Sequence, residues 1–181
     1  RIGDVLRKNP ERLKLVMTML ATMRGIPQIF AGDEMMFTSK DLSQGHGGLR
    51  VDFPGGWAGD ERDLFTAEGR TGLDKELFDH AQRLFQWRRT KPVIHNGRTM
   101  HFLSRDNTYA YFRYDDTDAV FVFINNSRGR KQIPWSHYAE IADGLCEGRN
   151  VLTGEACEPD DRTVVGPRQA LVVEFKRPSN R

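Results

Sequence analysis

The spacing of apolar residues changes once along this chain, and that change most constrains how the chain can fold. In two segments before residue 92, apolar side chains recur every three or four residues, which is the period of an α-helix. After residue 98 the pattern changes to a period of two, which is typical of β-strands. The sequence therefore predicts a mixed α and β fold, with a helical part at 1–95 and a β part at 96–181.

The first periodic segment, 9–24, has the signals of a helix at both ends. Asn9 can cap its first turn, Pro10 fits the first helical position, and Gly25 follows the last periodic residue. Its apolar positions predict one buried face: Leu13, Val16, Met17, Leu20 and Met23.

A short apolar run, Ile26 to Phe30, follows this helix and predicts a strand. It is apolar at both parities except at Gln28, as in strands of parallel sheets covered by helices. Pro27 cannot donate a ladder hydrogen bond, so we expect it at the start of the strand. Asp33 and Glu34 come directly after the run and have the appearance of catalytic acids.

A long stretch without periodicity, 31–72, separates the run from a second predicted helix at 73–89. Uninterrupted loops beyond about 15 residues are usually functional or disordered. This one carries four large aromatic residues, Phe37, Phe53, Trp57 and Phe65, which favour order. We expect an ordered loop over a binding site.

The segments after residue 98 predict a small antiparallel β domain, most simply a sandwich. "TYAYFRY" and "AVFVFIN" flank the polar turn 115–118 and form a hairpin, and further strands are expected near 149–152, 162–165 and 169–175. We expect most aromatic side chains of this domain in its core. A surface sugar site at Trp135 or Tyr138 is the alternative.

Composition and spacing exclude several functions. A net charge of +2 is too small to argue for nucleic acid, and no apolar run approaches the ~20 residues of a membrane helix. No Cys/His group has zinc-ligand spacing. Cys146 and Cys157 can form a disulfide or stay reduced, and the sequence leaves both open. The chain opens on Arg1 without a Met, as a fragment of a longer protein would.

Four motifs, in this order, resemble one enzyme family. They are "GIPQIFAGDE" at 25–34, "LRVDFPGGW" at 49–57, "LFQWRRTKPVIHNG" at 84–97 and "VLTGE" at 151–155. The chain resembles the C-terminal third of the α-amylase family (glycoside hydrolase family 13), in its neopullulanase and cyclomaltodextrinase branch. The first two motifs are specific together, and the other two are weak alone.

The resemblance implies a fold and the place of the catalytic residues. Residues 9–24, 26–30 and 73–89 become the seventh helix, eighth strand and eighth helix of a (β/α)8 barrel, and 96–181 become the β-sandwich called domain C. The three acidic residues of the family lie at the ends of strands four, five and seven, upstream of Arg1. The resemblance therefore assigns no catalytic residue to this chain.

Physical chemistry also argues against Asp33 and Glu34 as the catalytic pair. Retaining glycosidases place two carboxyl groups about 5–5.5 Å apart on opposite sides of the scissile bond. Neighbours at the end of a strand point to opposite faces. We expect Glu34 to make a structural hydrogen bond or ion pair beneath the loop, and Asp33 to lie nearer the cleft without catalysing.

The loop supplies the candidate substrate-binding residues, because active sites of such barrels lie in the loops after the strands. Trp57 and Phe53 are candidates to stack on sugar rings, and Arg50 and Asp52 to bind hydroxyl groups. The alternative is that Arg50 and Asp52 pair with each other or with barrel residues, and that the two rings are buried under the loop. The turn at 54–56 is expected to fix their geometry.

Many relatives carry Asp-Pro-x-x-Arg in this loop, whose Asp and Arg hold one glucose. Arg50 matches that Arg, but His46 and Gly47 stand at the Asp and Pro positions. This departure puts the paired clamp in question, with Asp52 as a candidate substitute.

The resemblance thus implies a fragment of a retaining hydrolase of α-glucans, such as starch oligosaccharides, cyclodextrins or pullulan, that is inactive alone. A non-catalytic carbohydrate-binding or structural β-sandwich module is the alternative. An α-glucan oligosaccharide is the expected partner of the intact enzyme, and the open barrel faces predict self-association. Calcium in the intact enzyme stays open, with no metal site evident here, and the family suggests a periplasmic or secreted enzyme.

Overall fold

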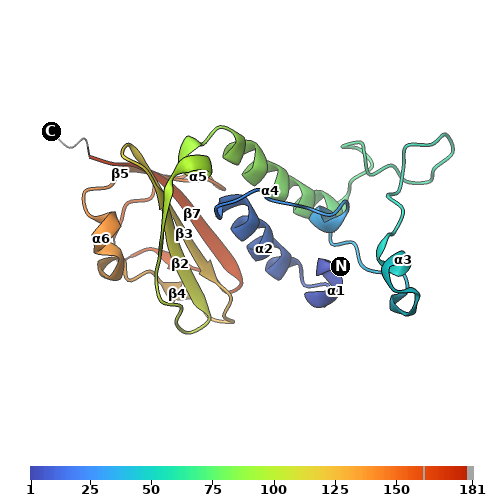
Figure 1. Cartoon of the computed structure of the whole chain (residues 1–181), viewed down its shortest axis with the longest axis horizontal. Helices are drawn as coiled ribbons and strands as arrows, with labels where there is room; N and C mark the ends of the chain where they lie inside the picture. Colours follow the sequence, from blue (N-terminus) through green and yellow to red (C-terminus); the bar gives the residue numbers. More distant parts are fainter. Residues whose placement is uncertain (161, 179–181) are drawn as a thin grey trace.

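The computed structural model describes residues 1–160 and 162–178, and the side chain of Leu42 lies outside that description. The helices before residue 90 lie in one half of the molecule and an antiparallel sheet in the other, with residues 36–70 projecting from the helical end (Figure 1). The helices are α1 Ile2–Val5, α2 Pro10–Thr22, α3 His46–Leu49, α4 Gly72–Arg89, α5 Pro92–Asn96 and α6 Ala139–Ala142. The strands are β1 Arg98–His101, β2 Thr108–Tyr114, β3 Asp118–Asn125, β4 Lys131–Gln132, β5 Cys146–Asn150, β6 Val164–Val165 and β7 Gln169–Lys176.

Both long helices form where the sequence predicts them. The Asn9 side chain accepts a hydrogen bond from the Arg12 amide at 2.8 Å, and Pro10 takes the first position of α2. Leu13 and Met17 pack against α4, while Leu15 turns to the sheet. The helix therefore buries two sides rather than the single face that its spacing predicts, because α4 and the sheet both cover it.

The strand predicted at 26–30 is not formed, which corrects that expectation. Pro27 and Ile29 are half-buried, whereas Ile26 is 98% exposed and Phe30 47% exposed. Burial therefore alternates along the run as it does in a strand, with Pro27 and Ile29 on the side that faces the helices. No neighbouring strand among the described residues accepts or donates its backbone hydrogen bonds, so no ladder forms.

The main sheet has five antiparallel strands in the order β1-β2-β3-β7-β5. The predicted hairpin of β2 and β3 is confirmed. Its turn is closed by the Asp115 carboxylate, which accepts hydrogen bonds at 2.9 Å from the amides of Thr117 and Asp118. Phe112 pairs with Phe121, and Phe121 with Val173, so large apolar residues line up across three strands.

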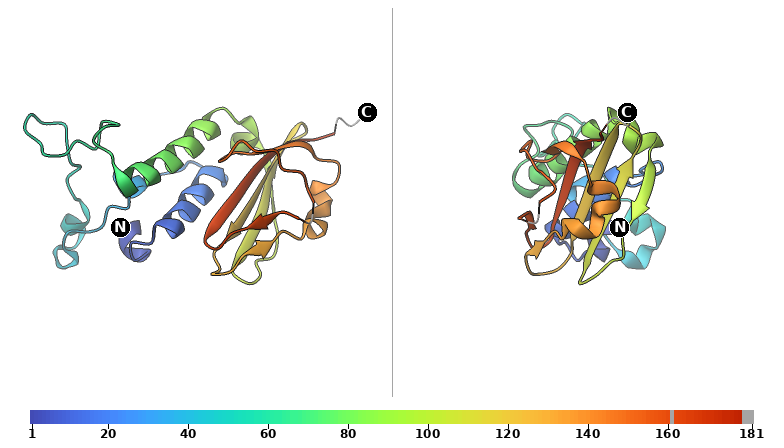
Figure 2. Two further views of the ribbon diagram at one scale, coloured as in Figure 1. Left: turned by 180° about the vertical axis from the view of Figure 1, so that it is seen from behind. Right: turned by 90° about the vertical axis from the view of Figure 1, so that its left-hand side faces the viewer.

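The two faces of this sheet carry different layers (Figure 2). Helices α2 and α5 cover the face with Tyr111 and Val122. The other face packs against the two-stranded sheet of β4 and β6 and against the helical segment 135–142. The second layer of the expected sandwich is therefore a short ribbon with helical turns.

Most aromatic side chains of the β part lie in its core, as predicted. Trp135 is 4% exposed and Tyr138 7% exposed, and both pack on Phe121. Neither ring forms an exposed platform for a sugar.

Candidate functional site

The loop that follows the 26–30 run is ordered around its own small core. Leu64 is 1% exposed. The ring centroids of Phe37 and Phe53 are 5.5 Å apart, and those of Phe53 and Phe65 are 4.5 Å apart. Offset aromatic contacts at this spacing are favourable beyond the area they bury. The prediction of an ordered loop is confirmed.

A glycine turn holds the middle of the loop against its later part. The Leu64 amide donates to the Pro54 carbonyl at 2.9 Å. Gly55 has φ +111°, and a Cβ atom there would lie 2.6 Å from the Asp63 Cα. Only glycine fits both the backbone angle and the close approach. The turn at 54–56 therefore fixes how the flanking residues 50–53 and 57 are presented.

Two carboxylates fasten the start of the loop to the N-terminal residues. The Ser39 amide and hydroxyl donate to Asp4 at 3.0 and 2.5 Å, and these hydrogen bonds lower the pKa of Asp4. The Arg1 guanidinium donates to Asp33 at 3.0 and 3.1 Å and lies 4.5 Å from the centre of the Phe30 ring. The pairing of Asp33 with Arg1 joins residues 32 apart and has no local signal in the sequence.

Three of the four candidate binding residues are exposed. Trp57 has 83% of its surface exposed and is held through its backbone amide, which donates to the Asp60 carboxylate at 3.0 Å. Arg50 and Asp52 are exposed, and within the described residues neither makes an ion pair or side-chain hydrogen bond. Phe53 is half-buried between two rings. The burial alternative therefore fails for Trp57, and the pairing of Arg50 with Asp52 is not formed.

Asp33 and Glu34 lie in a one-turn 3-10 helix, Asp33–Met35, and their surroundings differ. The Asp33 side chain is 14% exposed and bound by Arg1. The Glu34 Oε2 atom is buried, and no hydrogen-bond partner reaches it from the described part of the chain. The hydrogen bond or ion pair expected for Glu34 is therefore not formed at its Oε2 atom.

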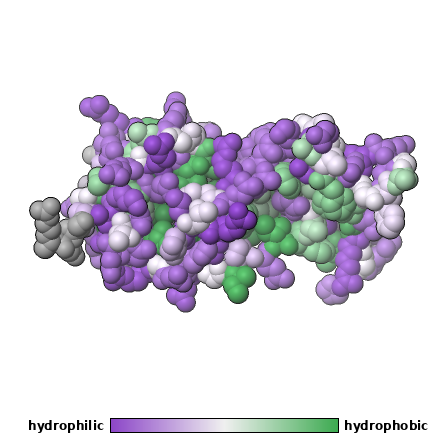
Figure 3. Space-filling model, turned by 90° about the horizontal axis from the view of Figure 1, so that it is seen from above, coloured by the Kyte–Doolittle hydropathy of each residue, from purple (hydrophilic) through white to green (hydrophobic). Residues whose placement is uncertain are grey.

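An apolar groove adjoins Glu34 on the open side of the helices. It lies between the coil residues Ile29 and Ala31 and the α4 residues Phe78 and Phe85. Figure 3, which views the molecule from above, shows apolar atoms gathered over the helical half. One buried carboxylate oxygen without a donor and exposed apolar side chains both carry a free-energy cost, so the arrangement favours further protein over this side.

No group of three or more His, Cys, Asp or Glu residues within 1–160 and 162–178 is placed to hold a metal ion. In the same ranges, no helix is long and apolar enough to cross a membrane. Both cysteines are free thiols in the structure.

Three comparisons place this geometry among known proteins. Residues 99–174 match the family model described as the cyclo-malto-dextrinase C-terminal domain. The chain is 27% identical over 140 residues to a maltogenic α-amylase of Bacillus acidopullulyticus, a match that covers 75% of this chain and 21% of that protein.

Solved α-amylase structures share the fold over 93–100% of the chain. An Anoxybacillus α-amylase superposes with a TM-score of 0.68 at 21% identity, covering 100% of this chain and 36% of the enzyme. The α-amylase of Geobacillus thermoleovorans, solved with acarbose, gives 0.62 at 20% identity, covering 93% of this chain and 34% of that one. The chain spans about a fifth of the curated relative and about a third of these structures. Together these matches confirm the resemblance to the C-terminal part of an α-amylase-family enzyme.

Proposed function

We propose that this chain is the C-terminal part of a retaining α-glucan hydrolase and is inactive alone. The match of residues 99–174 to the cyclo-malto-dextrinase C-terminal domain carries the proposal. The order of helix, loop, helix and β domain, shared in fold with α-amylases over the whole chain, supports it. Starch oligosaccharides, cyclodextrins or pullulan are the proposed substrates.

In this proposal residues 1–95 complete a (β/α)8 barrel and 96–181 form domain C. The run 26–30 takes the place of the eighth barrel strand. Its exposed side, Ile26 and Phe30, then faces the barrel interior, and its flanking strands come from the rest of the enzyme. The same neighbours would give the buried Glu34 Oε2 atom its missing donor.

The loop in this proposal forms one wall of the substrate cleft. Trp57 offers an exposed ring for the C–H face of a glucosyl unit, and Arg50 and Asp52 offer donors and acceptors for its hydroxyl groups. Phe53 supports the loop from within, because its ring is packed between Phe37 and Phe65. The catalytic acids belong to strands that this chain does not contain.

The non-catalytic module is the weaker candidate. It requires an exposed aromatic platform on the β domain, and Trp135 and Tyr138 are buried.

Kinetics of the extended protein, produced from its gene with the sequence upstream of Arg1, test the loop assignment. We expect Trp57→Ala to raise KM for maltoheptaose about tenfold, since tenfold corresponds to ~1.4 kcal/mol of binding. His95→Ala, on an exposed residue of α5, is the control and should leave KM unchanged. If neither Trp57→Ala nor Arg50→Ala changes the kinetics, the loop does not form part of the substrate cleft.

A further inference from the structure

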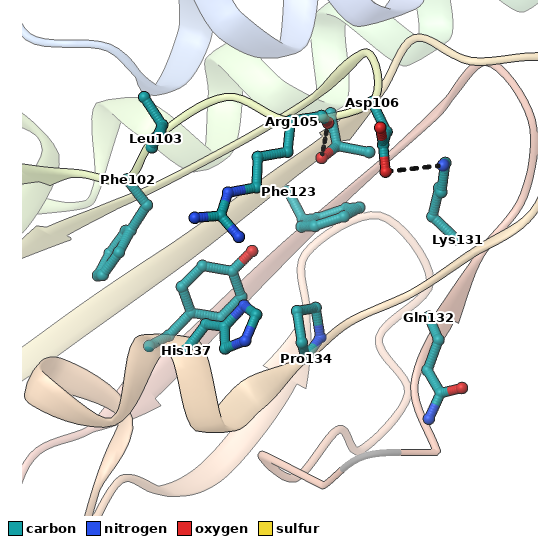
Figure 4. A pocket seen from close by; sticks show the side chains of 11 residues that line it. Phe102, Leu103, Arg105, Asp106, Phe123, Lys131, Gln132, Pro134 and His137 are labelled. Carbon is teal, nitrogen blue, oxygen red and sulfur yellow. Dashed lines mark hydrogen bonds and ion pairs between the residues drawn. The ribbon is translucent and has the colours of Figure 1, made fainter.

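The β domain contains a hollow in the half of the molecule away from the 36–70 loop. It opens between the connection from β1 to β2 and the segment that runs from β4 into the helical turn 135–138 (Figure 4). Its volume is about 520 Å³, within the ~300–1,000 Å³ usual for small-molecule sites. It lies on the face of the sheet away from α2, so the helices at 10–22 and 72–89 do not cover it.

Backbone hydrogen bonds hold both walls of the hollow. On one side a tight turn has positive φ at Asp106 (49°) and Asn107 (59°), as in the two-residue turns that suit hairpins. The Asn126 amide donates to the Asn107 carbonyl at 2.9 Å and ties this turn to the end of β3. On the other side the buried Ile133 donates its amide to the Thr163 carbonyl at 2.9 Å. The hollow is therefore preformed.

The floor of the hollow is apolar and partly aromatic. Phe102 is half-buried and meets the ring of Tyr138 edge-on, with centroids 4.8 Å apart. Phe123 and Pro134 continue the floor (Figure 4). Leu103, on the rim, is 80% exposed. A ligand that covers this floor must therefore present an apolar surface of its own.

The Arg105 side chain extends from one wall into the hollow. Figure 4 shows its guanidinium beside the rings of Phe102 and Phe123, with His137 across from it. Within the described residues, no ion pair or hydrogen bond engages the Arg105 guanidinium or the His137 ring. Their donors are therefore available to a ligand.

The charges that line the hollow do not cancel. Arg105 and Lys131 are cationic, and Asp106 is the one carboxylate among the described lining residues, so the lining carries a net positive charge. The Lys131 Nζ atom lies 3.8 Å from the Asp106 carboxylate, and the Asp106 side chain is 84% exposed, so water weakens this pair. The hollow therefore favours an anion over a neutral ligand.

We propose that this hollow binds a small phosphate monoester that carries a flat apolar ring. The Arg105 guanidinium is a planar fork that matches two phosphate oxygens, and Lys131 offers a point charge from the other wall. The three oxygens of a phosphate point in different directions, which suits donors on two walls better than the planar carboxylate does. The ring of the ligand packs on Phe102 and Leu103. This site does not depend on the proposed function.

Amide chemical shifts of the 1–181 chain, recorded by NMR during titration with phenyl phosphate, test this site. We expect concentration-dependent shifts clustered at 102–108 and 131–138. Inorganic phosphate, which has the charge without the ring, should bind at least about fivefold more weakly. Benzoate, which keeps the ring but has a carboxylate, should also bind more weakly than phenyl phosphate.

Two substitutions at the rim should change the affinity in opposite directions. Arg105→Gln should weaken phenyl phosphate binding at least about fivefold, because the forked cation is lost. Asp106→Asn should strengthen it, because a negative charge is removed and Asn also tolerates positive φ. Arg24→Gln, at an exposed position of the helical half, is the control and should bind as the parent chain does.

Three results would overturn the proposal. Phenyl phosphate may cause no shifts at 102–108 and 131–138, which would show that the hollow does not bind it. Equal affinity of the parent chain and Arg105→Gln would exclude the guanidinium as the anion ligand. Inorganic phosphate that binds as tightly as phenyl phosphate would show that the apolar floor takes no part.

Discussion

Single residues in this chain carry roles that their chemistry alone does not reveal. Asp33 and Glu34 are adjacent, yet Asp33 is held by Arg1 and Glu34 keeps a buried oxygen without a donor. Sequence reasoning rejects them as catalysts because neighbours cannot form the separated pair that a retaining glycosidase uses. It cannot foresee the Arg1 contact, which depends on the tertiary packing of distant segments.

His80 in α4 makes stability depend on pH. Its ring nitrogen Nε2 lies 3.3 Å from the Lys14 carbonyl of α2, and burial lowers its pKa from 6.5 to about 4. Nearby Lys14 and Arg83 lower the pKa further, and Glu76 opposes them. The folded state therefore favours the neutral ring.

The unfolding free energy keeps its full value above the pKa of His80 in the unfolded chain, near 6.5. It falls as the pH decreases toward 4, because over that range the unfolded chain binds the proton and the folded chain does not. We expect this group to remove about 2 kcal/mol of unfolding free energy between pH 7.5 and pH 5. Urea unfolding at both pH values measures it. His80→Gln should reduce the change in unfolding free energy between the two pH values, and the exposed control His95→Gln should leave it as in the parent chain. If all three chains lose the same unfolding free energy between pH 7.5 and pH 5, His80 is not the cause.

At the scale of elements, local signals predict α2, α4 and the β2–β3 hairpin well. Asn9 and Pro10 mark the start of α2, which ends at Thr22 with Met23 as its C-cap, short of the end predicted at Gly25. The continuous apolar run "AVFVFIN" forms a strand that is buried on both faces and has both neighbours within the chain. The run 26–30 is also mostly apolar but has no hydrogen-bonding neighbour among the described residues, so the predicted strand is wrong here. Short helices such as α3 and α5 carry too few turns for a period to show.

Arg88 joins the two long helices and is nearly buried. From α4 it donates to the carbonyls of Ala21 and Gly25 at 2.8 and 2.7 Å, and to Met23 at 3.2 Å. These carbonyls close the C-terminal end of α2, where intrahelical donors run out. The Arg88 guanidinium thus donates hydrogen bonds to three carbonyl oxygens.

We predict that Arg88→Lys lowers the unfolding free energy by about 1–3 kcal/mol, because an ammonium group cannot reach all three carbonyls in this geometry. The midpoint of urea unfolding measures it. Arg89→Lys, at the exposed neighbouring position, is the control and should change stability by less than about 0.5 kcal/mol. Equal effects at both positions would show that the carbonyl contacts contribute little.

At the scale of the whole molecule, the helical half has an uncovered apolar side. Ile26, Phe30 and the groove beside Phe78 and Phe85 face outward. In the proposed intact enzyme the remaining barrel covers them. The sequence pattern already carries this expectation, because one apolar run and two helices cannot close a barrel.

We therefore predict that the 1–181 chain self-associates through this side in solution. Light scattering coupled to size exclusion should give a mass above that of the monomer at micromolar concentration. Ile26→Asp/Phe30→Asp should shift the chain toward monomer, since a charge on each exposed position opposes apolar contact. Val5→Asp, at another exposed apolar residue, is the control. A monodisperse monomer of the parent chain would contradict the prediction.

Under the proposed function, the chain supplies a cleft wall and domain C to an α-glucan hydrolase whose catalytic acids lie elsewhere. The direct test is reducing-sugar release from maltoheptaose, measured for the purified 1–181 chain and for the extended gene product. We expect no release above buffer for 1–181 and turnover for the extended protein. Release by 1–181 that persists through repurification, or an extended protein inactive on every α-glucan, would contradict the proposed function.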